Sequence, residues 1–143
     1  MERNFWKDNI LILDGGMGTV LQQRGLPPGG QPELLNLTDP DLIRDVHRAY
    51  IDAGSRVVYS NTFGANALKL ARTGHTVEEI VTAAVQNARR AAGAEAKVAL
   101  DIGPLGELLE PMGSLPFERP MTSSARWLRP APGPVRIWLS SRL

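Results

Sequence analysis

The chain has 143 residues, of which 43% are hydrophobic and 22% charged, and its formal net charge is +1. This composition is typical of a globular domain and excludes a fibrous or disordered protein. A closed eight-stranded β/α barrel usually takes about 250 residues, so the length excludes a complete barrel. The sequence contains no cysteine, which excludes disulfides, thiolate metal sites and a cysteine nucleophile.

The first predicted unit is a strand followed by a helix. Residues 10–13 read Ile-Leu-Ile-Leu, a continuous apolar run that is typical of a strand buried on both faces. The run ends at Asp14, and a short helix is predicted over residues 17–24 with Gly25 as its left-handed cap. The Pro-Pro-Gly-Gly sequence at 27–30 then predicts a loop.

The next predicted helix begins at Pro40, with Asp39 as its N-cap, and ends before Gly54. His47 lies beside its apolar stripe, and we interpret this side chain as partly exposed rather than as a ligand. The predicted buried face consists of apolar residues that recur at steps of three and four: Leu42, Ile43, Val46, Ala49, Tyr50 and Ala53.

A second strand and a third helix repeat the pattern. Residues 57–59 read Val-Val-Tyr and run into a polar loop at 60–64. Thr76 and Glu79 form a capping-box pattern, which predicts a helix that Gly93 ends. A third strand is predicted over residues 97–100. The predicted buried face of the helix is Val77, Ile80, Val81, Ala84, Val85, Ala88 and Ala92.

Polar residues follow each of the three predicted strands. Strands that alternate with amphipathic helices pair in parallel through right-handed crossovers, so their carboxyl ends meet at one edge of the sheet, where α/β proteins bind ligands. Each of these residues alone is better explained as a turn or helix-cap residue. Together they predict a site at this edge, formed by Asp14, Asn61, Thr62 and Asp101.

The glycines and histidines add weaker signals. Gly15-Gly16-Met17-Gly18 lies between a strand and a helix and either presents backbone N–H groups to an anion or forms an ordinary tight turn. This segment matches neither GxGxxG nor the Walker spacing. His47 and His75 are the only imidazoles, and neither has a second ligand at helical spacing, so we predict no metal ligand among these residues.

Three motifs stand in order at the strand ends. They are Ile12-Leu13-Asp14-Gly15-Gly16-Met17-Gly18-Thr19, Ser60-Asn61-Thr62-Phe63-Gly64-Ala65-Asn66, and Asp101-Ile102-Gly103-Pro104-Leu105-Gly106 with Leu109-Glu110-Pro111-Met112-Gly113. Together they resemble the homocysteine S-methyltransferase family, most of all the homocysteine-binding domain of cobalamin-dependent methionine synthase. The resemblance covers residues 10 to about 118. It implies an α/β fold that holds about the first three βα units of a (β/α)8 barrel of the TIM type, an amino-terminal fragment.

The resemblance also implies a substrate and a set of contacts. Asp14 matches the acidic residue that faces the ammonium group of homocysteine, and the N–H groups of Gly15 and Gly16 suit its carboxylate. The other residues matched to the substrate pocket are Asn61, Thr62, Phe63, Asp101 and Gly103. The methyl donors of the family are methylcobalamin, methyltetrahydrofolate, betaine and S-methylmethionine, and the sequence does not distinguish among them.

Zinc is the cofactor that the resemblance implies. A free thiol of pKa about 8.5 is only roughly 3% thiolate at pH 7, whereas zinc keeps the homocysteine sulfur deprotonated beside the donor methyl. In the family the zinc ligands are cysteines on later strands, and this chain has no cysteine. We therefore expect a truncated form that lacks the zinc site and has negligible turnover.

Charge divides the chain at residue 118. Residues 1–118 carry 11 basic and 15 acidic side chains, whereas residues 119–143 carry five arginines, four prolines and no acid. We predict that residues 1–118 form the N-terminal part of the homocysteine-binding barrel domain and that residues 119–143 are an irregular basic tail. Three explanations of the tail stay open: a disordered segment, a nucleic-acid contact that no motif supports, and a shifted reading frame, which we favour.

The partners and location follow from the same features. Three strands of eight leave two open sheet edges, so we expect self-association. No early apolar run approaches the roughly 20 residues of a membrane helix, so we expect a cytoplasmic protein without a membrane partner. Two other functions stay open. The first is a doubly wound nucleotide-binding domain, which would not account for the second and third motifs. The second is a non-catalytic interaction module, which would lose its acidic partner when residues 119–143 are removed.

Overall fold

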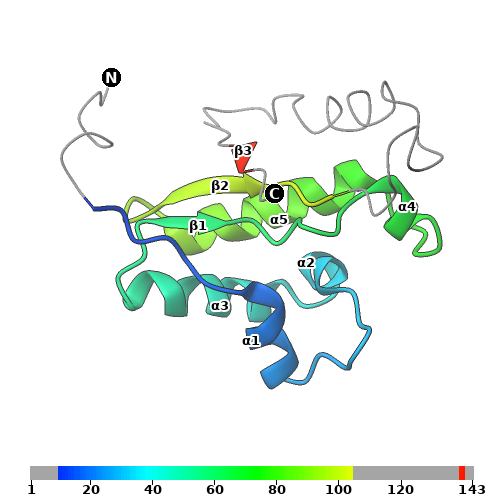
Figure 1. Cartoon of the computed structure of the whole chain (residues 1–143), viewed down its shortest axis with the longest axis horizontal. Helices are drawn as coiled ribbons and strands as arrows, with labels where there is room; N and C mark the ends of the chain where they lie inside the picture. The colour runs from blue at the N-terminus through cyan, green and yellow to red at the C-terminus, as the bar shows by residue number, and fades with distance from the viewer. Residues whose placement is uncertain (1–9, 105–138, 141–143) are drawn as a thin grey trace.

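The computed structural model of the chain describes residues 10–104 and 139–140. The elements in order are α1 (Met17–Gln23), η1 (Pro32–Leu34), α2 (Leu35–Thr38), α3 (Pro40–Asp52), β1 (Val57–Tyr59), α4 (Ala67–Leu70), α5 (Val77–Ala92), β2 (Lys97–Asp101) and β3 (Leu139–Ser140). Figure 1 shows the strands as a narrow layer, with α5 behind them and α1, α2 and α3 below. The fold is a mixed α/β arrangement around a small parallel sheet.

The strands pair in parallel, as the alternation of strands and helices predicts. β1 and β2 are in register from Val57 opposite Lys97 to Tyr59 opposite Ala99. β2 pairs on its other side with β3, where Leu100 lies opposite Leu139. The sequence analysis did not predict β3, which is the part of the 119–143 segment that the structure describes. The remainder of that segment and the motif at 109–113 lie outside the described residues.

The apolar run at 10–13 is the largest departure from the predicted fold. It lies beside β1, with a parallel bridge from Leu13 to Val57 and a hydrogen bond of 2.8 Å from the Arg56 N–H to the Ile12 carbonyl. The pairing is too short to form a strand. The run is also not buried on both faces, since Ile10 is 95% and Ile12 55% exposed. Among the described residues its backbone pairs with β1 alone, which leaves much of the run open to solvent.

The two long helices begin and end where the sequence predicts. The Asp39 side chain accepts a hydrogen bond of 3.2 Å from the Leu42 N–H at the start of α3. At the start of α5, Thr76 and Glu79 form the predicted capping box, with bonds of 2.8 and 3.2 Å. Gly93 follows α5 with a φ of +50°, a conformation that glycine adopts more readily than other residues. The short elements η1, α2 and α4 were not predicted.

The buried face of α3 differs from the predicted one. Ala49 and Ala53 are exposed, whereas His47 and Ile51 are buried together with Ile43 and Val46. The predicted stripe counted every apolar residue, and alanine satisfies that pattern on either side of a helix. The observed face follows the residues with the larger side chains, and it includes His47, so the prediction that this histidine is partly exposed is wrong.

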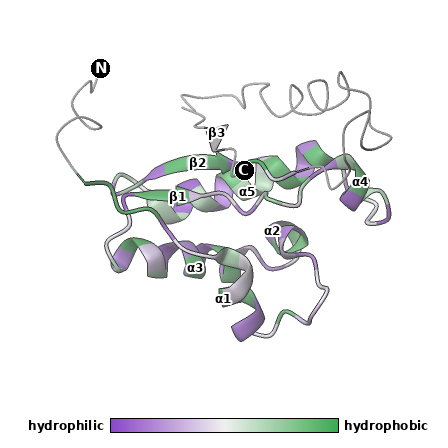
Figure 2. Ribbon diagram, viewed as in Figure 1, coloured by the Kyte–Doolittle hydropathy of each residue, from purple (hydrophilic) through white to green (hydrophobic). Residues whose placement is uncertain are grey.

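α3 and α5 cover the same side of the sheet, because they contact each other and both contact β1. Figure 2 shows hydrophobic residues along the strands, and both hydrophobic and hydrophilic residues along these two helices. Three groups of buried side chains form the core. They are Ile51, Val58, Ala92 and Ala96 between α3, β1 and α5; Ala65, Leu70, Ile80, Val85 and Leu100 around α5 and β2; and Leu21, Ile43 and Val46 between α1 and α3.

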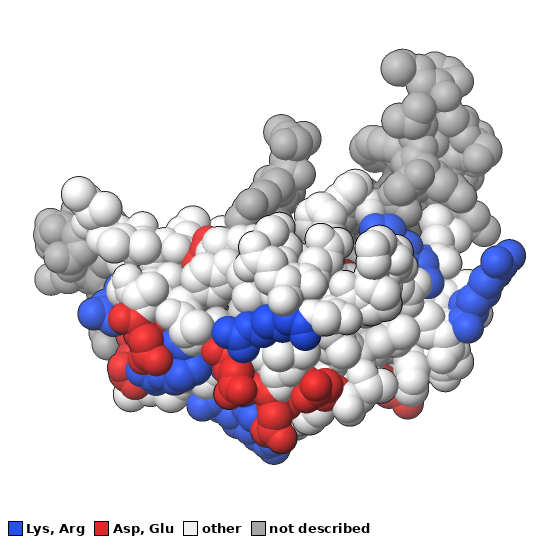
Figure 3. Space-filling model, turned by 90° about the horizontal axis from the view of Figure 1, so that it is seen from below, with Lys and Arg blue, Asp and Glu red and all other residues white. Residues whose placement is uncertain are grey.

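Charged side chains of both signs are mixed on the face where α1 and α3 lie, as Figure 3 shows. Arg48 of α3 bridges Asp52, at 2.6 Å, and Glu95 in the turn after α5, at 2.7 Å. The hydrogen bond from Arg48 lowers the pKa of Glu95 below its ordinary value. These ion pairs connect the ends of α3 and α5. Among the described residues, no helix has both the length and the apolar character needed to cross a membrane.

Candidate functional site

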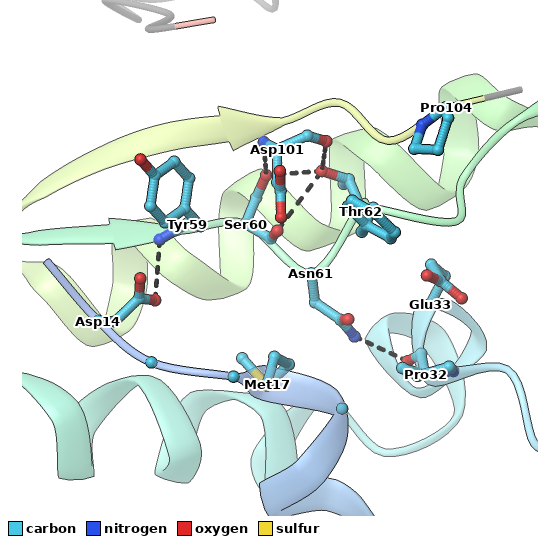
Figure 4. Close-up of a pocket in the computed structure, with 14 residues that line it drawn as sticks. Asp14, Met17, Pro32, Glu33, Tyr59, Ser60, Asn61, Thr62, Asp101 and Pro104 are labelled. Carbon is cyan, nitrogen blue, oxygen red and sulfur yellow. Dashed lines mark hydrogen bonds between the residues drawn. The ribbon is translucent and has the colours of Figure 1, made fainter. Parts of the chain in front are cut away.

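One pocket of about 460 Å³ lies at the carboxyl ends of the three parallel segments (Figure 4). A volume of this size is typical of small-molecule sites, which run from about 300 to 1,000 Å³. Seven of the eight residues predicted for the site line the pocket: Asp14, Gly15, Gly16, Asn61, Thr62, Phe63 and Asp101. The parallel arrangement therefore brings the three motifs together, as the order of strands and helices predicts.

Asp14 is fixed against β1. Its Oδ2 accepts a hydrogen bond of 2.9 Å from the Tyr59 N–H, which Figure 4 shows at the edge of the pocket. Its own N–H donates to the Val57 carbonyl at 3.1 Å. Both contacts continue the parallel pairing of residues 10–13 with β1. The position of the carboxylate therefore depends on strand pairing and not on a flexible loop.

The hydroxyl groups after β1 join the ends of β1 and β2. The Thr62 hydroxyl donates to the Asp101 carbonyl at 2.6 Å and lies 2.9 Å from the Ser60 hydroxyl. The Asp101 N–H donates to Ser60 Oγ at 3.3 Å. Ser60 and Thr62 are almost completely buried. Thr62 thus lines the pocket while its hydroxyl holds the two strand ends together.

Asn61 and Phe63 extend the wall in different ways. The Asn61 side chain is buried and donates a hydrogen bond of 2.7 Å to the Pro32 carbonyl, so it points toward η1. Phe63 is 44% exposed, and the ammonium group of Lys69 lies 6.0 Å from the centre of its ring. Asn61 therefore fixes the loop, whereas Phe63 is partly exposed at the surface beside Lys69.

Gly103 is the predicted site residue that does not line the pocket. It is buried, and a Cβ atom at this position would overlap the Phe63 carbonyl oxygen. Glycine is required here because the backbone of the 60–64 loop passes directly over it. Gly103 therefore shapes the pocket through Phe63, by close packing.

The sequence reasoning missed several residues that line the pocket, most importantly Glu33. Its side chain is only 7% exposed, and Oε1 accepts a hydrogen bond of 2.6 Å from the Gly64 N–H. The sequence signals only a helical turn here, because Pro32 is a good first residue of such a turn and η1 begins there; it does not mark Glu33 as a pocket residue. Pro32, Tyr59, Ser60, Met17, Gly18 and Pro104 complete the lining.

Comparison with known proteins assigns the family. The sequence profile of the homocysteine S-methyltransferase family matches residues 11–129, which is most of the chain. The chain belongs to this family. The match includes all eight predicted site residues and extends eleven residues past position 118, into the segment that we predicted as an irregular tail.

Solved homocysteine methyltransferase structures resemble the chain as well. The oxidized form of the homocysteine methyltransferase MmuM from Escherichia coli has 29% sequence identity and a TM-score of 0.63, and the match covers 70% of this chain and 39% of that one. The metallated form of the same protein has 29% sequence identity and a TM-score of 0.63, and the match covers 70% of this chain and 40% of that one. The apo form has 30% sequence identity and a TM-score of 0.53, and the match covers 70% of this chain and 38% of that one. The chain therefore spans about two fifths of the length of this relative.

The residues present do not fit the zinc ion that the homocysteine S-methyltransferase family implies. Among residues 10–104 and 139–140, no three His, Cys, Asp or Glu side chains lie close enough to hold a metal. The sequence also has no cysteine, so the thiolate donors are missing from the whole chain.

His47, the buried histidine of α3, is not a ligand of the pocket. It is completely buried, it does not line the pocket, and neither ring nitrogen has a hydrogen-bond partner. Burial lowers its pKa from 6.5 to about 4. The imidazole is therefore neutral at pH 7, and its effect is on stability.

Proposed function

We propose that the pocket binds the amino-acid end of L-homocysteine, as part of a methyltransferase that converts homocysteine to methionine. One observation carries the proposal: the described parts of the three motifs converge on a pocket of small-molecule size within the region that matches the family. The two strand-end carboxylates Asp14 and Asp101 line this pocket, and no lysine or arginine of the described chain does. Such a set of charges favours the ammonium group of an amino acid.

Each part of the amino-acid group has a proposed partner. Asp14 faces the ammonium, and the N–H groups of Gly15 and Gly16 receive the carboxylate, because backbone N–H groups at a strand-to-helix turn suit an anion. Asn61, Thr62, Phe63 and Asp101 form the opposite wall. Gly103 contributes by allowing the Phe63 backbone to approach.

The wider fold that we propose is the first three βα units of a (β/α)8 barrel. Two features support it: the parallel order of the segments 10–13, β1 and β2, and the placement of α3 and α5 on the same side of the sheet. A doubly wound sheet carries helices on both faces, so the nucleotide-binding alternative gains no support from this arrangement.

The chemistry proposed for this chain is substrate binding without methyl transfer. A thiol of pKa about 8.5 is only roughly 3% ionised at pH 7, and the protonated sulfur is a poor nucleophile. The chain orients the amino-acid end of the substrate, but it has no cysteine, and residues 10–104 and 139–140 supply no donor set that would deprotonate the sulfur.

Calorimetric titration with L-homocysteine tests the proposal. We expect saturable binding by the wild type and at least roughly tenfold weaker binding by Asp14→Asn, because a charge-assisted hydrogen bond to the ammonium is lost. Asparagine retains an oxygen for the Tyr59 N–H, so this variant changes the charge and not the strand pairing. Incubation of the wild type with homocysteine, zinc and each family donor is expected to give no methionine at enzymatic rates.

The matched control is Asp45→Asn, which removes an exposed carboxylate from the outer side of α3. Its affinity is expected to equal that of the wild type. Equal affinities for the wild type and Asp14→Asn would contradict the proposed contact. Methionine formation comparable to that of an intact methyltransferase would contradict the proposed lack of turnover.

Self-association is a second expected property. Ile10, Ile12 and Leu13 are 95%, 55% and 45% exposed, and an open apolar edge favours pairing with a second copy. We expect sedimentation velocity to show dimers or larger species at micromolar concentration, and Ile12→Glu to shift the population toward monomer. Leu68→Glu, at an apolar position of α4 that is 48% exposed, is the control and should change nothing. A compact monomer in the wild type would be evidence against this expectation.

A further inference from the structure

Glu33 places a buried carboxylate in the pocket wall that the proposed substrate contacts do not use. It belongs to η1, a turn that is separate from the three strand ends, and it lines the same pocket. Its side chain is only 7% exposed. Oε1 accepts the Gly64 N–H at 2.6 Å, and a bond from a backbone N–H to an ionised acceptor is among the stronger hydrogen bonds in proteins.

The contact between Glu33 and Gly64 leaves no space for a side chain at position 64. A Cβ atom there would lie 2.5 Å from Oε1 of Glu33 and 2.9 Å from its Cδ. Gly64 is not among the glycines with positive φ, so backbone conformation does not explain why this residue is glycine. The close approach of the carboxylate explains it.

The same turn also holds the other end of the loop. The Asn61 side chain donates to the Pro32 carbonyl at 2.7 Å, and the Asn36 side chain donates to the Asn61 carbonyl at 2.8 Å. The loop from Asn61 to Gly64 is thus attached at both ends to the segment from η1 to α2. Between these two attachments lie Thr62 and Phe63, which face the pocket.

We propose that Glu33 is a positioning residue: its carboxylate holds the Gly64 amide and thereby sets the wall of the pocket between Asn61 and Gly64. The identity of the bound ligand rests on the proposed function, whereas the contact with Gly64 does not. A positioning role requires only an oxygen that accepts the Gly64 N–H. A direct contact with the substrate ammonium would instead require the negative charge.

Two substitutions separate these roles. Glu33→Gln keeps an acceptor oxygen and removes the charge, and Glu33→Leu keeps the approximate size and removes the acceptor. Amide hydrogen exchange measured by NMR is expected to become at least about tenfold faster at Gly64 in Glu33→Leu and to stay within about threefold of the wild type in Glu33→Gln. Unchanged exchange in the buried part of α5 shows that each variant is folded.

Titration with L-homocysteine gives the second readout. We expect Glu33→Leu to bind about tenfold more weakly and Glu33→Gln to bind as the wild type does. Glu78→Leu removes an exposed carboxylate from the first turn of α5 and is the matched control. Gly64→Ala disrupts the same contact without changing Glu33, because the added methyl group displaces the Glu33 carboxylate. This variant is therefore also expected to bind L-homocysteine more weakly than the wild type.

Two results would overturn the inference. One is exchange at Gly64 that is as slow in Glu33→Leu as in the wild type. The other is an equal loss of binding in Glu33→Gln and Glu33→Leu while the Gly64 amide stays protected in Glu33→Gln, since that result assigns the effect to charge. If the wild type binds no L-homocysteine, the proposed function fails, and exchange at Gly64 alone decides whether Glu33 positions the loop.

Discussion

The free energy of unfolding of this chain is expected to fall by about 3 kcal/mol through His47 alone when the pH is lowered from 7 to 4. Burial lowers the pKa of this imidazole to about 4, from an ordinary value of 6.5. Both ring nitrogens lack hydrogen-bond partners, and the side chain is completely buried. The folded chain therefore disfavours the protonated form, because a buried cation there would have no compensating contact.

The direction of the effect follows from which state binds more protons. Between about pH 6.5 and 4 the unfolded chain is protonated at His47 and the folded chain is not, so lowering the pH favours unfolding. The contribution of neutral His47 to the free energy of unfolding is fully present above pH 6.5 and is lost as the pH falls toward 4. Below pH 4 both states are protonated, and the contribution of this residue no longer changes.

Urea unfolding of His47→Leu at pH 7.5 and pH 4.5 measures this effect against the wild type. Leucine has a similar size and no ring nitrogens to leave without partners, so we expect the variant to match or exceed wild-type stability at pH 7.5. At pH 4.5 the variant should be clearly the more stable of the two. His75→Gln changes an exposed histidine and is the control. If the wild type and His47→Leu lose the same free energy of unfolding between pH 7.5 and pH 4.5, this explanation is contradicted.

Asn36→Ala is expected to destabilise the chain by about 2 to 4 kcal/mol. The Asn36 side chain is 2% exposed and donates two hydrogen bonds of 2.8 Å, to the carbonyls of Glu33 and Asn61. Alanine leaves the Asn61 carbonyl without this donor in the interior, which costs about 1 to 3 kcal/mol. It also removes a hydrogen bond worth about 0.5 to 1.5 kcal/mol from the Glu33 carbonyl, which keeps the Leu35 N–H as a donor. Thermal or urea unfolding at pH 7 measures the loss.

Gln86→Ala is the matched control for Asn36→Ala, because it removes an exposed amide side chain from α5. Its effect is expected to stay within about 0.5 kcal/mol of zero. A similarly small effect of Asn36→Ala would show that water replaces the lost bonds. In that case the attachment of the 61–64 loop to the segment from η1 to α2 would be weaker than the distances indicate.

Local signals in the sequence were sufficient for the parts of the fold that local chemistry determines. The capping box at Thr76, the N-cap at Asp39 and the apolar run at 57–59 each act within a few residues, and the structure confirms all three. Parallel order then followed from the alternation of strands and helices, and it brought Asp14 and Asp101 to one pocket.

Features that depend on distant contacts were not predictable in the same way. The Ile-Leu-Ile-Leu run indicates a strand that is covered on both faces, but burial depends on which other segments are present. Periodicity alone did not separate Ala49, which is exposed, from His47, which is buried. The contact of Glu33 with Gly64 joins residues 31 positions apart, and no local pattern marks it.

The order in which the chain is synthesised has a consequence for the cavity. Every described residue that lines it lies between Asp14 and Pro104, and the contacts that shape it span long stretches of sequence. Asp14 meets the Tyr59 amide across 45 positions, and Thr62 meets the Asp101 carbonyl across 39. During translation the Thr62 hydroxyl therefore cannot reach its partner before β2 has been synthesised, so the wall that this contact holds cannot be complete until then.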